Sequence, residues 1–178
     1  MTQYMSLIMV LLALALAVPA SASAQIEVEV DPFAYGLSGF SLHLAGVSSG
    51  YRLSIGTFGI DVPRFLHGND GWSMTMRGAG IKADWLGSRI DGFFIGADAN
   101  YYRNSYTLDD VDVTEKRNEY ALGVRGGYRL PIGRSGLYLA PWVGVGYNFG
   151  GGDIVTGDGT FEHSAISVFP TVHIGWRF

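Results

Sequence analysis

The chain has 178 residues, which is enough for one domain. Its 12 basic and 16 acidic residues give a net charge of −4 at pH 7 and form no basic stripe, so the composition speaks against a nucleic-acid partner. The absence of cysteine excludes a disulfide framework and a thiolate metal site, so if the chain is exported, its fold alone must hold it together.

Residues 1–24 are typical of a secretory signal peptide. An unbroken apolar run covers residues 7–18, and small residues follow up to Ala22-Ser23-Ala24, which fits an A-x-A cleavage site. The run is too short to span a bilayer as a helix, which takes roughly 20 residues. No Lys or Arg precedes the run, so a short membrane anchor is the alternative. We expect one mature domain, residues 25–178, that begins at Gln25.

The first strand of this domain has two candidate locations. Residues 26–30 can form a short strand before Asp31-Pro32. Alternatively, residues 33–45 can divide at Ser38-Gly39, where the apolar alternation changes phase. The sequence leaves this choice open.

Alternation of apolar and polar residues with period 2 dominates the rest of the chain and indicates β-strands. Seven strands are clear, at residues 33–45, 51–62, 72–86, 93–104, 119–130, 137–149 and 163–178. A closed barrel of the bacterial outer-membrane kind has an even number of strands, so we expect the undecided segment to supply the eighth strand. Two strands change phase, near Gly56-Thr57 and at Gly78-Ala79-Gly80, where a β-bulge fits. With these changes each strand keeps one apolar face.

The connections between the strands alternate in length. Short turns are expected at residues 46–50, 87–92 and 131–136, and longer loops at 63–71, 107–118 and 150–162, the last two acidic. Short turns at one end and long loops at the other are typical of outer-membrane barrels.

Three features predict that the apolar face points outward. The polar faces combine glycine with charged residues, which fits the narrow interior of an eight-stranded barrel. The chain ends in Phe178 on an alternating strand. Tyr and Trp gather near the strand ends of the apolar face, as in an interfacial girdle: Tyr51, Trp72, Trp85, Tyr101, Tyr120, Tyr128, Tyr147 and Trp176. A soluble lipocalin-like carrier is the alternative, but the Gly-x-Trp expected near its first strand is absent.

A last strand that alternates and ends in Phe resembles the assembly signal of bacterial outer-membrane proteins. The pattern over residues 33–178 resembles the small OmpA/OmpX-type β-barrel group, although His173 stands where Gly is frequent. The resemblance implies an all-β fold, an eight-stranded antiparallel up-and-down transmembrane β-barrel in the outer membrane of a Gram-negative cell. It also implies outer-membrane lipid around the wall and the barrel-assembly machinery as a partner during biogenesis, with Ile174, Trp176 and Phe178 as the signal. It implies no single activity, because this shape serves several functions.

The sequence offers no catalytic constellation. The four histidines lack metal-ligand spacing, and no H-E-x-x-H occurs. A lipid deacylase of the barrel type would place His and Ser two apart on one strand, whereas His163 and Ser164 are adjacent and point to opposite faces. We therefore expect no catalytic residue, no cofactor and no metal.

Charged residues on the inward faces are the remaining candidates. An unpaired charge in a lumen poor in water is strongly disfavoured, so we expect a paired network. Its predicted members are Arg52, Arg77, Lys82, Arg125, Arg129 and Arg177 with Asp61, Asp84, Asp98 and Glu119.

The sequence thus predicts a structural or surface-interaction barrel whose lumen is plugged by paired charges. One alternative is a narrow channel or carrier for small solutes, and another is a lipid-modifying barrel enzyme. The sequence names no surface ligand.

Overall fold

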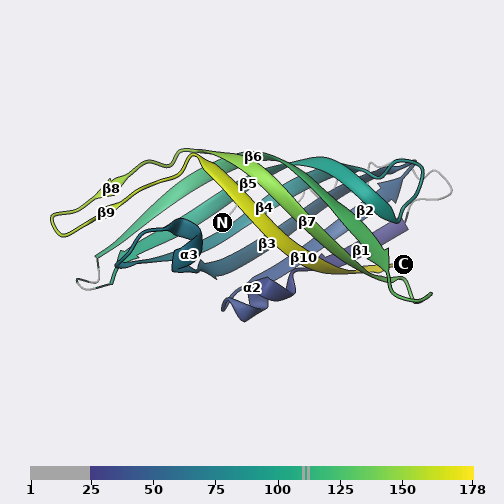
Figure 1. Ribbon diagram of the computed structural model, residues 1–178, viewed down its shortest axis with the longest axis horizontal. Coiled ribbons are helices and arrows are strands. Elements are labelled where there is room, and N and C mark those ends of the chain that lie inside the picture. The colour runs from purple at the N-terminus through teal and green to yellow at the C-terminus, as the bar shows by residue number, and fades with distance from the viewer. Residues whose placement is uncertain (1–24, 110, 112) are drawn as a thin grey trace, which may run out of the picture.

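The computed structural model of the protein describes residues 25–109, 111 and 113–178, so the expected signal peptide lies outside the described residues. Eight strands close into an antiparallel barrel in the order β1-β10-β7-β6-β5-β4-β3-β2, which confirms the expected fold (Figure 1). The barrel strands are β1 (Gln25–Val30), β2 (Phe40–Ser48), β3 (Tyr51–Val62), β4 (Trp72–Trp85), β5 (Gly92–Leu108), β6 (Val113–Pro131), β7 (Leu137–Phe149) and β10 (Ile166–Arg177). A small separate hairpin is formed by β8 (Ile154–Val155) and β9 (Thr160–Phe161).

The connections between the strands are short at one end of the barrel and longer at the other, as predicted. Tight turns join the strands at one end, and the β8–β9 hairpin and the helix α3 (Arg64–His67) lie at the other (Figure 1). The expected loop at residues 107–118 is wrong in its extent, because β5 and β6 remain paired as far as Leu108 and Val113. The side chains of this segment are polar on both faces, which is typical of a loop. The backbone hydrogen bonds between β5 and β6 nevertheless continue through it.

The first strand is β1, which decides between the two locations that the sequence left open. It ends at Val30. The carboxylate of the next residue, Asp31, accepts a hydrogen bond from the Phe33 backbone N–H at 2.9 Å and caps the short helix α2 (Pro32–Gly36). The chain then turns back through Gly39, which lies against β3. A Cβ at Gly39 would lie 1.8 Å from the carbonyl oxygen of Gly59, so only glycine permits this approach.

The seam between the chain ends is the shortest contact in the wall. β1 pairs with β10 only over Glu27–Val30 and Ile174–Arg177. The part of β10 before Ile174 therefore extends past β1, and α2 packs beside β2, β3 and β10 in this sector (Figure 1). Arg177 and Phe178 bring the C-terminus to the turn end of the barrel, where the Phe178 N–H donates to the Ile26 carbonyl at 2.9 Å.

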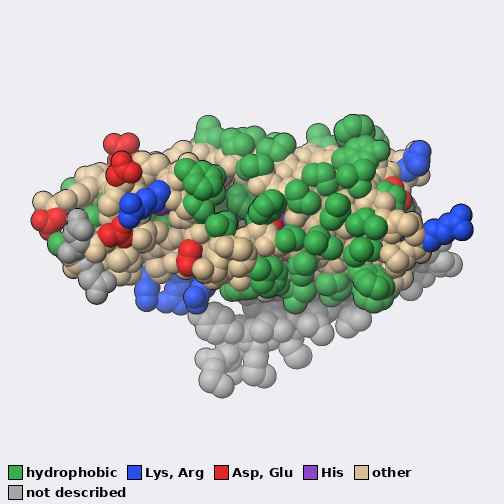
Figure 2. All heavy atoms as spheres, turned by 60° about the horizontal axis from the view of Figure 1, so that its bottom comes forward, with side chains coloured by type: hydrophobic (Ala, Val, Ile, Leu, Met, Phe, Trp, Pro, Cys, Tyr) green, Lys and Arg blue, Asp and Glu red, His purple; other side chains and the backbone are tan. Residues whose placement is uncertain are grey.

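Apolar side chains form a belt on the outside of the barrel, and charged side chains gather at its two ends (Figure 2). Strands β5, β6, β7 and β10 have the predicted faces. Val124, Val143 and Ile174 are exposed on the outside, whereas Arg125 and Glu119 are buried inside. An aliphatic surface of this extent is stable in lipid and not in water.

The two predicted phase changes are wrong. The β3–β4 register runs without interruption from Tyr51↔Trp85 to Val62↔Met74, and the β4–β5 register is equally continuous, so there is no bulge at residues 78–80. As a consequence Trp72 and Ile60 lie inside the barrel, and Trp72 is not part of the outer girdle. Arg77 and Asp61, predicted to lie in the lumen, are exposed on the outside.

The physical reason is an inversion of polarity along the strands. Within the belt, the apolar face is outside. Beyond the belt, the outer face of the same strands is polar, with Ser73, Thr75 and Ser105, and the inner face becomes an apolar core with Trp72 and Tyr106. When a regular strand crosses this boundary, its apolar residues move from the outer face to the inner face, although the strand register does not change.

None of the helices among the described residues is long and apolar enough to span a membrane.

We expect Val143→Arg to destabilise the barrel by about 2–4 kcal/mol in lipid vesicles, because Val143 lies at the middle of β7 in the apolar belt and is 49% exposed on the outside. The matched control is Val155→Arg, on the outer hairpin and 76% exposed, where the same charge meets water. Urea unfolding in vesicles measures both. Equal stability of the two variants would place the belt in water.

Candidate functional site: the barrel interior

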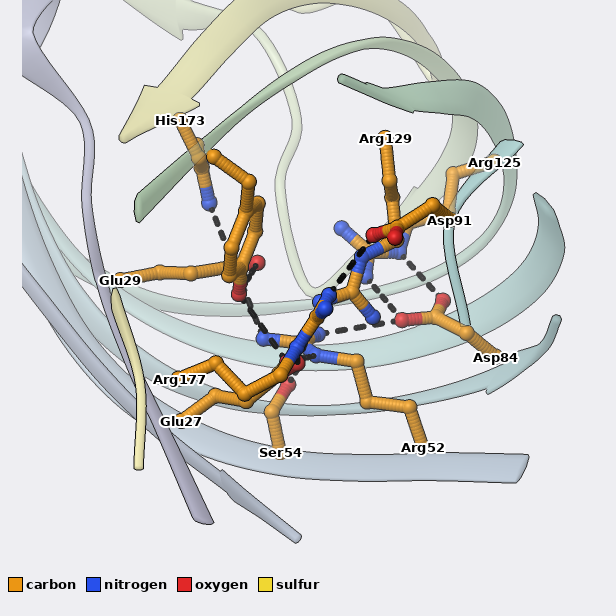
Figure 3. Close-up of polar contacts among 11 residues, drawn as sticks. Glu27, Glu29, Arg52, Ser54, Asp84, Asp91, Arg125, Arg129, His173 and Arg177 are labelled. Atoms are coloured by element: carbon orange, nitrogen blue, oxygen red, sulfur yellow. Dashed lines mark hydrogen bonds and ion pairs between the residues drawn. The ribbon is translucent and has the colours of Figure 1, made fainter. Parts of the chain in front are cut away.

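A fully buried carboxylate from the first strand, Glu27, lies inside the turn-end half of the barrel. Glu27 accepts hydrogen bonds from four side chains that come from four other strands (Figure 3). Its Oε2 accepts from Arg52 Nε at 2.9 Å and from the Tyr138 hydroxyl at 3.0 Å. Its Oε1 accepts from Arg129 Nη2 at 2.5 Å and from Arg177 Nε at 3.1 Å. The approximately four acceptor sites of a carboxylate are thereby used.

Arg52 on β3 connects three carboxylates. Besides Glu27, its Nη2 lies 2.8 Å from Glu29 and its Nη1 lies 3.1 Å from Asp84 (Figure 3). All four side chains are almost fully buried. A guanidinium with its fixed planar donors is suited to such a bridge.

Asp84 on β4 and Glu29 on β1 add further contacts to β6, β7 and β10. Asp84 accepts from Arg125 through two bonds, at 3.0 Å and 2.6 Å. Glu29 lies 2.8 Å from the same Tyr138 hydroxyl, whose single hydrogen is shared between the two glutamates, and 3.0 Å from His173 Nδ1. Gly175 leaves room for the tyrosine, because a Cβ there would lie 2.1 Å from its ring.

Arginine side chains in the network also lie over aromatic rings. The guanidinium of Arg125 is 5.0 Å from the Trp142 ring centre, and that of Arg129 is 4.4 Å from the Tyr138 ring centre. These cation–π contacts stabilise charge that has left water. The cavity enclosed by the network, Phe94 and Trp142 measures about 10 Å³, roughly the space of one water molecule.

Lys82 belongs to a second layer beside this network. Its Nζ lies 3.5 Å from His43 Nε2 and 5.3 Å from the Trp142 ring centre. Asp98, its partner on β5 across the ladder, instead accepts from Asn100 at 2.5 Å. Within the described residues no carboxylate forms an ion pair with Lys82.

Glu119 lies nearer the loop end and has no arginine partner among the described residues. It accepts from the Tyr106 hydroxyl at 2.5 Å and lies 3.0 Å from His163 Nε2. The sequence-based expectation that Glu119 neutralises a lumen arginine is therefore corrected, because Arg125 points to Asp84.

Apolar clusters lie on either side of the polar network. At the loop end, Trp72, Tyr106, Leu108, Ile154 and Phe161 pack together, with the last two supplied by the β8–β9 hairpin. At the turn end, Val47, Leu86 and Phe94 form the other cluster. Next to this second cluster, a recess of about 330 Å³ opens to the outside, and it is lined mainly by the two turns that follow β2 and β4.

The loop-end cluster is tied to α3 and its following loop. Asn69 donates to the Glu162 carbonyl at 3.1 Å and accepts from the Glu162 N–H at 2.7 Å, and the His67 ring stacks on Phe161 at 5.5 Å. Burial, together with the Arg64 guanidinium, lowers the pKa of His67 below its ordinary value. The neutral form of this histidine therefore dominates at pH 7.

The predicted residues thus divide into three groups. Five of them meet in the network: Arg52, Asp84, Arg125, Arg129 and Arg177. Three more lie inside but apart from it: Lys82, Asp98 and Glu119. Arg77 is outside, together with Asp61, which belongs to the same prediction.

Sequence reasoning missed the two glutamates on which the network depends. Glu27 and Glu29 lie on β1, which was left undecided. The alternation Ile26-Glu27-Val28-Glu29-Val30 carries the same period-2 signal as the longer strands and could have placed both carboxylates inside.

The predicted C-terminal signal residues lie together on the outer face of β10. Ile174, Trp176 and Phe178 are all exposed, and the Trp176 and Phe178 rings stack at 6.4 Å.

Neither a protein family nor a curated relative matches the chain in sequence. Solved structures do match its fold. Neisserial surface protein A has a TM-score of 0.50 and 12% identity, over 87% of this chain and 94% of that one. A major outer membrane protein of Thermus thermophilus has a TM-score of 0.50 and 13% identity, over 88% of this chain and all of that one. The chain has the fold of a small outer-membrane β-barrel. At this level of identity the likeness concerns the fold alone.

We expect Arg52→Met to destabilise this barrel by about 3–5 kcal/mol, because the change leaves three buried carboxylates short of a partner. The control is Arg64→Met, which removes an arginine that is 60% exposed and paired with Asp109 at the surface. We expect that change to lower stability by less than about 1 kcal/mol. Urea unfolding in detergent or vesicles gives both values, and similar losses would contradict a structural role of the network.

Proposed function

We propose that the protein resides in the outer membrane of a Gram-negative cell and serves a structural or surface-interaction role, with its lumen closed to diffusion. The apolar belt supports the membrane location, because so much exposed aliphatic surface requires lipid. The outer-membrane proteins that share the fold support the same membrane. Export by residues 1–24 and assembly through the C-terminal strand belong to the same proposal.

A single observation carries the closed lumen: Arg52 is buried and within ion-pair distance of Glu27, Glu29 and Asp84, carboxylates from two other strands. These groups meet across the interior instead of lining a water column. The apolar clusters at both ends add two further barriers. The surface that remains for interaction is the loop end, with α3, the β5–β6 tip and the β8–β9 hairpin.

We expect the wild-type protein to give no steady conductance steps in planar bilayers, because no continuous hydrated path is left between the clusters. A variant that opens only the loop-end cluster tests this point in the same chain. Phe161→Gly and Trp72→Gly, made together, remove two rings of the loop-end cluster, while the unchanged ion-pair network still blocks the path. That variant should also be silent, because the ion-pair network and the turn-end cluster both remain in the path. Ion-selective steps from the wild type would support the channel alternative.

We also propose that the barrel has no catalytic activity. The histidine and carboxylate that meet at the loop end, His163 and Glu119, are held with Tyr106 inside the barrel end. Mass analysis of lipid A from cells with and without the protein tests this point. We expect identical acylation patterns, and a loss or gain of one acyl chain would favour the lipid-modifying enzyme.

A further inference from the structure

Two arginines stand directly opposite each other on the outside of the barrel, at the edge of the apolar belt. Arg77 on β4 and Arg103 on β5 are ladder partners, and both side chains are exposed. The next outward pair toward the turn end is Ala79 with Tyr101, and the next toward the loop end is Thr75 with Ser105. The arginines therefore mark the boundary between the apolar belt and the polar outer surface.

Like charges directly opposite on neighbouring strands are destabilising. The side-chain oxygens on the neighbouring ladder positions do not offset the repulsion between the two arginines. Asp61, beside Thr75, accepts from the Thr75 hydroxyl at 2.9 Å, and Asn118, beside Arg103, accepts from the Tyr101 hydroxyl at 2.9 Å. Within the described part of the chain, no hydrogen bond or ion pair engages either guanidinium.

The wall is shaped to hold Arg77 in place. Its ladder partner on β3 is Gly59, and a Cβ there would lie 3.1 Å from Arg77 Cγ and 2.9 Å from the Phe40 ring. The aliphatic stem of Arg77 thus lies on the bare backbone of β3. Lys116, ladder partner of Ser105 on β6, is also exposed and adds a third positive charge on the loop side.

We propose that Arg77 and Arg103 together bind the phosphate of an anionic membrane lipid. Guanidinium groups bind phosphate through paired, charge-assisted hydrogen bonds, and one phosphate between two arginines offsets their mutual repulsion. The acyl chains would extend from the phosphate toward the turn end and lie against Ala79, Ile81 and Ala99, where the outer wall is apolar and most side chains are small. A membrane lipid is the occupant because its charge and its chains match the two sides of this boundary.

This inference rests on the proposed membrane location, but its test uses folded protein in micelles of a zwitterionic detergent. Native mass spectrometry counts bound short-chain phosphatidic acid, with phosphatidylcholine of the same chains and inorganic phosphate as the other two probes. We expect the wild type to retain phosphatidic acid in preference to phosphatidylcholine. Inorganic phosphate should bind far more weakly, because it cannot use the belt, and equally strong binding of free phosphate would overturn the assignment to a lipid.

The decisive variant is Arg77→Ala with Arg103→Ala. We expect it to weaken phosphatidic acid binding by at least about tenfold, because several charge-assisted bonds are lost. The matched control is Arg89→Ala with Arg134→Ala, which removes two exposed arginines from the turn end and leaves the net charge equal. Equal loss in the control, or unchanged binding in the decisive variant, would overturn the site.

A second measurement separates lipid binding from a structural role. Without anionic lipid, Arg77→Ala should leave urea stability unchanged or raise it, because a repulsive pair is removed. A clear loss of stability would instead make Arg77 a structural residue. Steady conductance in bilayers would contradict the closed lumen but leave this site intact, so the two proposals fail separately.

Discussion

The structure depends on one buried carboxylate. Glu27 lies on the shortest complete strand of the wall, and its two oxygens bind side chains from β3, β6, β7 and β10. A buried charge is tolerated only when it is fully paired, so these strands must reach their final positions for Glu27 to be stable. The ion-pair network therefore determines which strands pack around Glu27 and how far along the barrel axis each of them is placed.

The interior and the outer surface follow from the same alternation. Inside the belt the small residues Gly56, Gly96 and Gly175 leave room for His43, Asp84 and Tyr138, so that a narrow barrel can hold several large polar side chains. Outside, the same strands present aliphatic and aromatic residues. The boundary where this division reverses is also where Arg77 and Arg103 lie, which links the end of the belt to the proposed lipid site.

The sequence predicted the faces of β5, β6, β7 and β10 because apolar residues lie outside over most of their length. It failed where a strand leaves the belt. Trp72, Met74 and Ile60 are apolar and point inward, so reading apolar as outward along the whole strand produced phase changes that do not exist and placed Arg77 inside. The partners of individual charges, such as Glu119 with His163, depend on long-range packing that no local pattern encodes.

The short β1–β10 seam also has a consequence for the order in which the barrel assembles. It joins residues about 150 positions apart, as the bond between Arg177 and Glu27 does, whereas each other wall contact joins two barrel strands that follow one another along the chain. Closing so large a loop has the greatest entropic penalty of any step. The four residue pairs of backbone contact offset it together with side-chain bonds to β10 from Glu27, Glu29 and Asp31. The hairpins can therefore form first as an open sheet, and the two chain ends meet last.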